Sequence, residues 1–309
     1  MRRWTAADIP RQQGKKAVVT GANSGLGFHV ALELARAGAC VILACRDARK
    51  GKDALARIRA QIPRAGVSLE RLDLADLASV RAFSNKIVRR GKLDLLVNNA
   101  GILAPAERET TADGFEIQFG VNHLGHFALT GWLLPALRRA RRPRVVTVSS
   151  LAHGSANLDF SDLQAERAYS PWGSYGQSKL ANLLFSFELQ ARSDAAQAGL
   201  LSVAAHPGLA ATNILPAGPG MHGLSLPTLV LMMAGSLICQ SAAQGALPIL
   251  YATTSPDVAS GRFYGPDGIG EFWGYPQEAW VSPLARDRKT ALKLWRVSEK
   301  LTGTVYGNW

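Results

Sequence analysis

The sequence predicts an α/β protein with one Rossmann-type, doubly wound parallel sheet of about seven strands, helices on both faces and a C-terminal helix. Short runs rich in Val, Leu and Ile alternate with amphipathic segments, and the runs lack the apolar–polar alternation of half-exposed strands. Alternation of strands and helices is typical of a parallel sheet, whose right-handed crossovers bring loops and ligand to the carboxyl ends of the strands.

The elements can be placed in chain order from these patterns. Strands are expected at 17–20, 40–44, 67–72, 94–98, 144–149 and 201–206. Helical periodicity is expected at 25–37, 47–60, 76–90, 114–138 and 176–193. A last helix is expected after Ser282, which would be its N-cap, with Pro283 in the first turn.

The length of 309 residues and the composition predict a single domain, residues 1–309. We divide it into an N-terminal arm (1–15), a dinucleotide-binding core (16–270) that includes a lid (207–240), and a C-terminal extension (271–309). The lid begins with a stretch rich in Pro and Gly and leads into the apolar segment 224–239. That segment is shorter than the ~20 residues that span a bilayer, so we expect it to be buried or to form a dimer or peripheral membrane contact.

Charge and cysteine content limit the partners and the compartment. The net charge is +12, with basic clusters at 138–144, 46–52 and 89–92, which we interpret as solvated helix ends and loops. An anionic cofactor or membrane surface is the alternative, and nucleic acid is not expected, because no stretch interleaves these bases with aromatic residues. Three cysteines and no apolar N-terminal leader favour a cytoplasmic location, with membrane association as a variant.

The stretch TGANSGLG (20–27) is the first candidate site. It lies between a buried strand and a helix, and its glycines are Gly21, Gly25 and Gly27. Glycines let the backbone approach a diphosphate, and the following helix N-terminus offers free N–H groups to the anion. The context therefore predicts a dinucleotide site.

The end of the next strand bears on which dinucleotide is bound. NAD(H) usually meets an acidic side chain there, but this strand ends with Cys45 and Arg46. Arg46 is suited to a 2′-phosphate, so NADP(H) is the preferred cofactor and NAD(H) the alternative. Asp47 would either neutralise Arg46 or start the next helix as its N-cap.

Tyr175 and Lys179 are the candidate catalytic pair. They lie four residues apart on a predicted helix, so they share one face, and no other tyrosine has a lysine four residues later. A nearby ammonium stabilises a phenolate and is expected to lower the tyrosine pKa, which suits proton exchange with a carbonyl or alcohol oxygen. The scattered histidines lack metal-ligand spacing, so no metal is expected, and packing is the favoured role of His123 and His126.

Together, T-G-x-x-x-G-x-G (20–27), NNAG (98–101), VSS (148–150) and Y-x-x-x-K (175–179) resemble the short-chain dehydrogenase/reductase family, over roughly residues 15–265. The resemblance implies that Ser150 hydrogen-bonds the substrate oxygen, Tyr175 exchanges the proton and Lys179 also holds the nicotinamide ribose. Asn122 would help to hold a water relay to Lys179. Ser149 is the competing serine, because a shift of one residue would turn it into the sheet packing.

The same resemblance implies the cofactor contacts. Asp73 would hydrogen-bond the adenine, and Thr212 would contact the nicotinamide amide. Asn98 and the NNAG turn would stabilise the sheet beside the cofactor. The expected cofactor-binding residues are Gly21, Asn23, Ser24, Gly25, Leu26, Gly27, Arg46, Asp73, Leu74, Asn99, Ala100, Gly101, Tyr175, Lys179, Pro207, Gly208 and Thr212.

The chain departs from most of the family in the long insert at 151–174, which either lines the substrate entrance or faces solvent. With VSSLAH, ACRD and SKLANLLF, it is similar to the retinol-dehydrogenase-like branch, which includes relatives of protochlorophyllide reductase. Trp172 of the insert and Met232 and Met233 of the apolar segment would give a flexible, apolar pocket.

The sequence therefore predicts an NADP(H)-preferring oxidoreductase that transfers hydride between the nicotinamide and a carbonyl or alcohol of a hydrophobic substrate. Reduction of a C=C bond with the same Tyr and Lys is one alternative. A non-catalytic NADP-binding regulatory or scaffold protein is the other, because fold does not guarantee activity. Relatives pair through the helix that carries Tyr175, which implies a homodimer or homotetramer.

Overall fold

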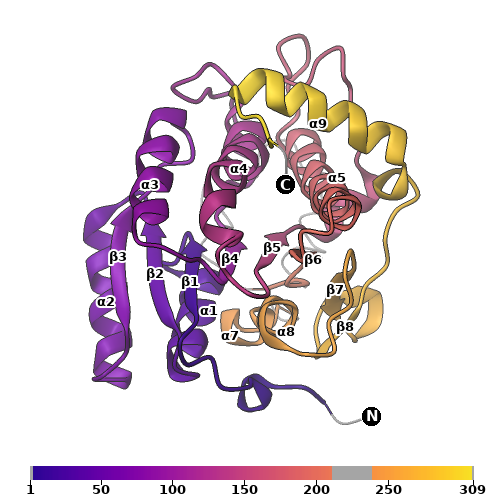
Figure 1. The fold of residues 1–309 in the computed structure, drawn as a ribbon. Coiled ribbons are helices and arrows are strands. Elements are labelled where there is room, and N and C mark those ends of the chain that lie inside the picture. The colour runs from indigo at the N-terminus through magenta and orange to yellow at the C-terminus, as the bar shows by residue number, and fades with distance from the viewer. Residues whose placement is uncertain (1–2, 211–238, 308–309) are drawn as a thin grey trace.

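The computed structural model describes residues 3–210 and 239–307. Within them, one sheet of eight strands runs in the order β3-β2-β1-β4-β5-β6-β7-β8 (Figure 1). All neighbouring strands are parallel except β8, which pairs antiparallel with β7. The predicted α/β class with a doubly wound sheet is confirmed.

Six strands match the six predicted runs: β1 (Lys16–Thr20), β2 (Cys40–Cys45), β3 (Val67–Arg71), β4 (Leu95–Asn98), β5 (Arg144–Val148) and β6 (Leu201–Ala205). Two strands at one edge of the sheet, β7 (Phe263–Pro266) and β8 (Pro276–Glu278), were not predicted. Both are short, and the Gly and Pro residues within them are read as turn signals in a sequence.

Helices cover both faces of the sheet. One face carries α1 (Gly25–Arg36), α2 (Ala48–Gln61), α7 (Ala242–Gly245) and α8 (Leu247–Thr254). The other carries α3 (Leu77–Arg89), α4 (Gly125–Leu137) and α5 (Pro171–Ala195). The C-terminal helix α9 (Arg288–Thr302) lies across α4 and α5 (Figure 1).

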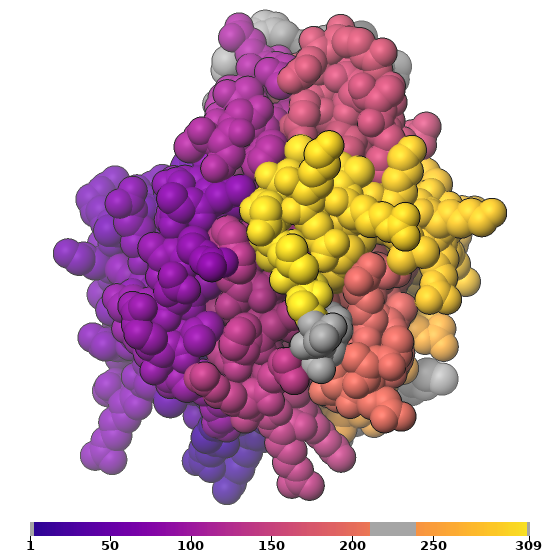
Figure 2. Space-filling view, turned by 45° about the horizontal axis from the view of Figure 1, so that its top comes forward, coloured from indigo at the N-terminus to yellow at the C-terminus, as the bar shows by residue number. Residues whose placement is uncertain are grey.

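Aromatic packing fixes α9 in this position. Trp295 of α9 is buried, and its ring centroid lies 5.0 Å from that of Phe127 on α4 and 5.9 Å from that of Phe185 on α5. Figure 2 shows the C-terminal segment, in yellow, on the outer surface of the molecule. The predicted C-terminal helix is therefore present as an additional layer.

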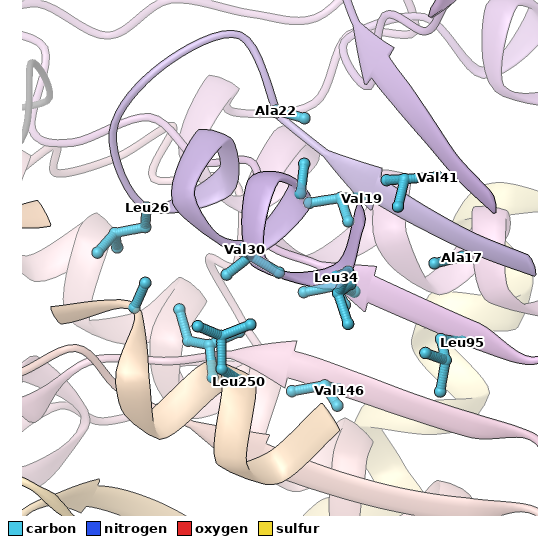
Figure 3. Packing of buried hydrophobic residues seen from close by; sticks show 14 of the residues in the cluster. Ala17, Val19, Ala22, Leu26, Val30, Leu34, Val41, Leu95, Val146 and Leu250 are labelled. Atoms are coloured by element: carbon cyan, nitrogen blue, oxygen red, sulfur yellow. The ribbon is translucent and has the colours of Figure 1, made fainter. Parts of the chain in front are cut away.

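The core follows from the alternation of side chains along the central strands. Ala17 and Val19 of β1 pack on the α1 side together with Val30 and Leu34 of α1 (Figure 3). Val18, between them, belongs to the cluster on the opposite face. Because both faces are buried, the strand is apolar throughout, and this is why the sequence pattern predicted it.

Three helix boundaries differ from the sequence predictions. Helix α5 begins at Pro171, five residues earlier than expected, because the Ser170 side chain caps it by accepting the Gly173 N–H. The expected helix 114–138 contains a π-helical turn, η2 (Phe119–Leu124), before α4.

The third boundary is the start of α9. The prediction of Ser282 as its N-cap is wrong: Asp287 caps the helix and accepts the N–H groups of Lys289 and Thr290. The Ser282 hydroxyl instead accepts the Ala285 N–H of the short turn η6 (Leu284–Arg286). A carboxylate can accept two amide bonds at once, which favours the later start.

The predictions for Thr212, Met232, Met233 and the segment 224–239 lie outside the described residues, as does most of the lid. In residues 3–210 and 239–307, no helix is both long enough and apolar enough to cross a membrane.

Candidate active site

One cleft at the carboxyl ends of β1, β2 and β4 collects most of the predicted cofactor residues. Twelve of them line it: Gly21, Asn23, Ser24, Gly25, Leu26, Gly27, Arg46, Asp73, Leu74, Asn99, Ala100 and Gly101. The cleft is also lined by five residues that the sequence reasoning did not name, Thr20, Ala44, Leu72, Ile102 and Val121. Pro207, Gly208, Tyr175 and Lys179 are not among its lining residues.

The glycine loop has the shape that a diphosphate needs. Gly21 has a φ of +66°, which glycine adopts readily, and its N–H donates to the Ala44 carbonyl. A Cβ on Gly27 would lie 2.5 Å from Asn99 Nδ2 and 2.6 Å from the Gly21 carbonyl oxygen. Any side chain at Gly27 would therefore press into the turn that forms the cradle.

Two polar features of the cleft fit an anionic dinucleotide. The N-cap of α1, Ser24, makes no side-chain capping bond, so the first N–H groups of that helix stay free for a ligand. The Oδ1 atom of Asn99 is buried and has no hydrogen-bond partner within the described part of the chain. Free N–H donors thus lie at the start of α1, and the buried, unpaired acceptor belongs to a residue that lines the cleft, so the residues present fit the cofactor.

The end of β2 settles the role of Asp47. Its carboxylate accepts the Lys50 N–H at 3.0 Å as N-cap of α2, and this bond holds the Asp47 pKa below its usual value. Arg46 is exposed, lines the cleft and makes no ion pair with any residue that the structure describes. Cys45 is buried, and burial raises the pKa of its thiol to about 11, which makes it an unreactive strand residue.

Asp73, expected at the adenine, lies at the far wall of the cleft beside Leu74. One of its carboxylate oxygens accepts the Ala75 N–H at 3.0 Å, and its own N–H donates to the Ser79 hydroxyl. These bonds fix the turn after β3 and leave the other carboxylate oxygen for a ligand. The assignment to the adenine stays a prediction.

The structure separates the two candidate serines that follow β5. Ser149 is buried, and its hydroxyl donates to the Lys179 carbonyl at 2.7 Å, so it packs the strand against α5. Ser150 is half-buried, and its side chain lies close enough to Tyr175 to oppose the rise in the pKa of that tyrosine that burial causes. The Ser150 side chain, not that of Ser149, therefore lies beside the candidate catalytic tyrosine.

Tyr175 and Lys179 share one face of α5, as their spacing predicts. The Lys179 Nζ lies 5.5 Å from the centroid of the Tyr175 ring and donates to the Val148 carbonyl at 3.3 Å. The lysine side chain is buried, and burial lowers its pKa to about 8.

The expected decrease of the tyrosine pKa does not occur with the protein groups alone. Burial raises the pKa of Tyr175 above its ordinary value of 10.0, and the nearby Ser150 side chain opposes this shift. The cause is that the phenolate would lose its hydration on burial, and the Lys179 ammonium, 5.5 Å from the ring centroid, does not offset that loss. Tyr175 is thus held as a phenol, the form that donates a proton.

Asn122 lies in the π-helical turn η2, the kind of local irregularity that often marks functional sites. Its Oδ1 accepts the Ile102 N–H at 2.7 Å, and its Nδ2 donates to the Ile102 carbonyl and to the Ser178 hydroxyl. A Cβ on Gly101 would lie 3.2 Å from Asn122 Oδ1 and 3.5 Å from Lys179 Nζ. Gly101 therefore joins the cofactor cleft to the catalytic group.

Thr20 and His126 connect these parts and were not named as site residues. The Thr20 hydroxyl accepts the N–H groups of Asn99 and Ala100 and lies 2.9 Å from His126 Nε2. His126 Nδ1 in turn contacts the Asn122 carbonyl at 3.0 Å. Burial lowers the His126 pKa to about 4, so the ring is a neutral packing link between β1 and the π-helical turn.

The insert at 151–174 contacts both the site and the rest of the protein. Trp172 is 36% exposed, and its ring meets the Tyr175 ring edge-on with centroids 6.1 Å apart. Farther from the site, the Tyr169 hydroxyl donates to the Pro105 carbonyl. Trp172 therefore lies next to the candidate catalytic tyrosine and stays partly exposed, whereas Tyr169 anchors the insert.

Comparison with known proteins gives a family and close relatives. The short chain dehydrogenase family matches residues 15–217. Retinol dehydrogenase 12 of Mus musculus is 41% identical over 300 residues, covering 97% of this chain and 89% of that protein. Polyprenol dehydrogenase of Mus musculus is 39% identical over 307 residues, covering 97% and 87%. A crystal structure of an uncharacterized protein from Mycobacterium paratuberculosis superposes with a TM-score of 0.81, 43% identity and 99% coverage of both chains.

Fold, site and comparisons agree on the class of protein: the chain belongs to the short-chain dehydrogenase/reductase family. Within that family it is an oxidoreductase similar to the retinol dehydrogenases, an NAD(P)-dependent alcohol or carbonyl dehydrogenase. The resemblance read from the sequence motifs is confirmed.

Proposed function

We propose that the protein is an NADP(H)-preferring oxidoreductase that transfers hydride between the nicotinamide and a carbonyl or alcohol carbon of a hydrophobic substrate. The observation that supports this proposal most strongly is that the dinucleotide cleft and the Asn122–Lys179 group adjoin each other at Gly101. The backbone of that residue lines the dinucleotide cleft and lies against Asn122 Oδ1 and Lys179 Nζ. A cofactor in the cleft would therefore end beside Ser150 and Tyr175.

The side chains divide the proton chemistry among them. The bound nicotinamide supplies or accepts the hydride. Tyr175 donates the proton to the carbonyl oxygen in reduction and takes it back in oxidation. Ser150, whose side chain lies beside Tyr175, orients that oxygen. Lys179 brings a positive charge to the tyrosine, which stabilises the phenolate that forms after proton transfer.

A hydrophobic substrate is supported by exposed apolar side chains, one of which lies beside Tyr175, and by the relatives. Trp172, Leu209, Phe272 and Trp280 are among the large apolar side chains that stay exposed, and Trp172 touches the Tyr175 ring. The relatives are named for retinol and for polyprenol, two lipophilic alcohols. We therefore propose lipophilic aldehydes, ketones or alcohols as the substrate class.

Arg46→Ala tests the cofactor preference. The guanidinium lies at the cleft without an ion pair in the described residues, so it is available to a 2′-phosphate. Loss of such a charged hydrogen bond is worth about 1.5–3 kcal/mol, so we expect KM for NADPH to rise about 10- to 100-fold and KM for NADH to change little. Steady-state kinetics with both cofactors measure this ratio.

Arg49→Ala is the matched control, because Arg49 is also exposed on α2 but does not line the cleft. It should leave both KM values unchanged. An equal increase for NADPH and NADH in the Arg46 variant would contradict the assignment of the 2′-phosphate to Arg46.

A further inference from the structure

His206 directly follows β6 and is held in one tautomer by its neighbours. The ring is fully buried, and its centroid lies 5.0 Å from that of Phe263 on β7. The Gly208 N–H donates to His206 Nδ1 at 3.2 Å, so Nδ1 is an acceptor and the proton resides on Nε2. A Cβ on Gly265 would lie 1.9 Å from His206 Nε2, so glycine at that position leaves room for the ring.

The Glu271 carboxylate accepts a hydrogen bond from that Nε2–H and a second hydrogen bond from the backbone. His206 Nε2 lies 3.0 Å from one carboxylate oxygen of Glu271, and the Trp280 N–H donates to the other at 2.7 Å. Although burial opposes it, these hydrogen bonds hold the Glu271 pKa below its usual value, so the carboxylate is ionised at neutral pH. Two donors thus need two acceptors, and a carboxylate provides both.

The backbone of Glu271 has an energetically unfavourable conformation in the arrangement that places its carboxylate beside His206. Its φ is +58°, a left-handed conformation that non-glycine residues rarely adopt. Conformations of this kind persist where the surroundings hold them, and they are frequent at functional sites. Here Glu271 makes the two hydrogen bonds of its carboxylate and a third that its N–H donates to the Gly268 carbonyl.

The segment after Glu271 contacts the Pro207–Gly208 turn directly. The Phe272 carbonyl accepts the Leu209 N–H at 2.7 Å, and a Cβ on Gly208 would lie 2.4 Å from that same carbonyl oxygen. Gln240 donates to the Pro207 carbonyl from another side. The turn that we expect at the nicotinamide end of the cofactor is therefore fixed by residues from beyond the parallel strands β1–β6.

A second path leads from Glu271 to Ser150. Trp280, whose N–H the carboxylate accepts, has its ring centroid 5.5 Å from that of His153. His153 Nδ1 lies 2.8 Å from the Ser150 carbonyl, which can only accept, so this nitrogen donates. His153 Nε2 accepts the Ser282 N–H. Glu271 is thus linked to the Pro207–Gly208 turn through His206 and to the Ser150 backbone through Trp280 and His153.

We propose that Glu271 is a positioning residue, which acts through His206 on the Pro207–Gly208 turn and through Trp280 on Ser150, and so sets the distance between the nicotinamide and the substrate oxygen. This inference rests on the proposed oxidoreductase function. Glu271 touches neither reacting atom. Its role is to hold the Pro207–Gly208 turn and Ser150 in fixed positions relative to each other at the carboxyl ends of the strands.

Glu271→Gln is the direct test, because glutamine keeps the size of the side chain but offers one acceptor instead of two. Its NH₂ group would face either the Trp280 N–H or the His206 Nε2–H, donor against donor. A small displacement of reacting groups is costly, so we expect kcat with NADPH and decanal to fall about tenfold or more. Kd for NADPH, followed by its fluorescence, should rise less, because the cleft at β1, β2 and β4 is unchanged.

Glu278→Gln is the matched control. Glu278 is on the neighbouring strand β8, pairs with exposed Arg262 and does not contact the turn, so kcat should stay at the wild-type level. Equal kcat in Glu271→Gln and wild type, with only a lower melting temperature, would show a purely structural role and overturn the proposal.

A double-mutant cycle with His206→Gln further separates a positioning role of Glu271 from a purely structural role. Glutamine at 206 can donate to Glu271 but cannot accept the Gly208 N–H in the same geometry. If both residues act through one turn, the loss of kcat in the double variant will be smaller than the product of the single losses. Independent, multiplicative losses would contradict the proposed path.

The controls also distinguish this inference from the function on which it rests. Wild-type protein that binds neither NADPH nor NADH would overturn the oxidoreductase proposal and this inference with it. Wild-type protein that reduces decanal, together with a fully active Glu271→Gln variant, would leave the function standing and remove the positioning role.

Discussion

Replacement of Tyr175 by phenylalanine is expected to abolish turnover while NADPH still binds. The substitution removes one hydroxyl and keeps the ring, whose contacts with Trp172 and Lys179 do not involve that oxygen. The lost group is the proton donor of the proposed mechanism, and general acid–base groups contribute about 10²- to 10⁴-fold. We expect kcat to fall within that range and Kd for NADPH to stay within about twofold, measured by stopped-flow and fluorescence titration.

Tyr169→Phe provides the comparison. The Tyr169 hydroxyl donates to the Pro105 carbonyl and accepts from Gln118 Nε2, so its removal is expected to lower stability and to leave the proton transfer unchanged. Wild-type kcat is expected for this variant. If Tyr175→Phe kept wild-type kcat, another group would have to supply the proton and the mechanism would be wrong.

Replacement of Lys179 by methionine is expected to have opposite effects on activity and stability. Activity should fall at least a hundredfold, because the charge beside Tyr175 is lost. The cofactor-free protein should become more stable at pH 7. The pKa decrease from 10.5 to about 8 corresponds to about 3 kcal/mol of destabilisation of the buried ammonium, and loss of the hydrogen bond to Val148 offsets about 1 kcal/mol of the gain.

The stability gain should depend on pH in a defined direction. Below pH 8 the lysine is protonated in the folded and unfolded states, so the wild type carries the full cost of burying the charge. As pH rises from about 8 to 10.5, the folded protein binds fewer protons than the unfolded chain, and the cost shrinks. The net gain of about 2 kcal/mol at pH 7 should therefore disappear between pH 8 and 10.5 and become a loss of about 1 kcal/mol above pH 10.5, where only the lost hydrogen bond to Val148 remains.

Urea unfolding of the wild type and of Lys179→Met across this pH range measures the difference directly. Lys52→Met, at an exposed position of α2, controls for the general effect of removing a lysine and should show no gain. A Lys179→Met protein less stable than wild type at pH 7 would mean that the ammonium makes compensating interactions that its burial does not reveal.

The sequence predicted best those features that depend on short-range patterns. The glycine loop, the NNAG turn and the Tyr175–Lys179 pair are contiguous motifs or one helical turn apart, and parallel strands bring their loops to one edge automatically. The six inner strands were predictable because burial on both faces makes them apolar throughout.

The features that the sequence did not predict depend on opposing physical effects or on contacts between residues that lie far apart in the chain. The direction of the Tyr175 pKa shift is the balance of burial against the effect of the Ser150 side chain, and only the structure gives the extent of burial. Ser282 and Asp287 are both acceptable N-caps in sequence, and the Asp287 carboxylate, which accepts two N–H groups of the first turn, caps α9. The contact between His206 and Glu271 joins residues 65 positions apart, without any local pattern that announces it.

Transfer of deuterium from the cofactor to a product tests the central claim most directly. NADPH deuterated at the nicotinamide C4 on the transferred face is incubated with the protein and with decanal, retinaldehyde or a cyclic enone, and the products are analysed by mass spectrometry. We predict one deuterium on the former carbonyl carbon of an alcohol product, and label that forms about 10²- to 10⁴-fold more slowly with Tyr175→Phe. Deuterium on the β-carbon of the enone would instead identify a C=C reductase. Absence of label from every product, although NADPH binds, would contradict an oxidoreductase acting on such substrates and favour a non-catalytic NADP-binding protein.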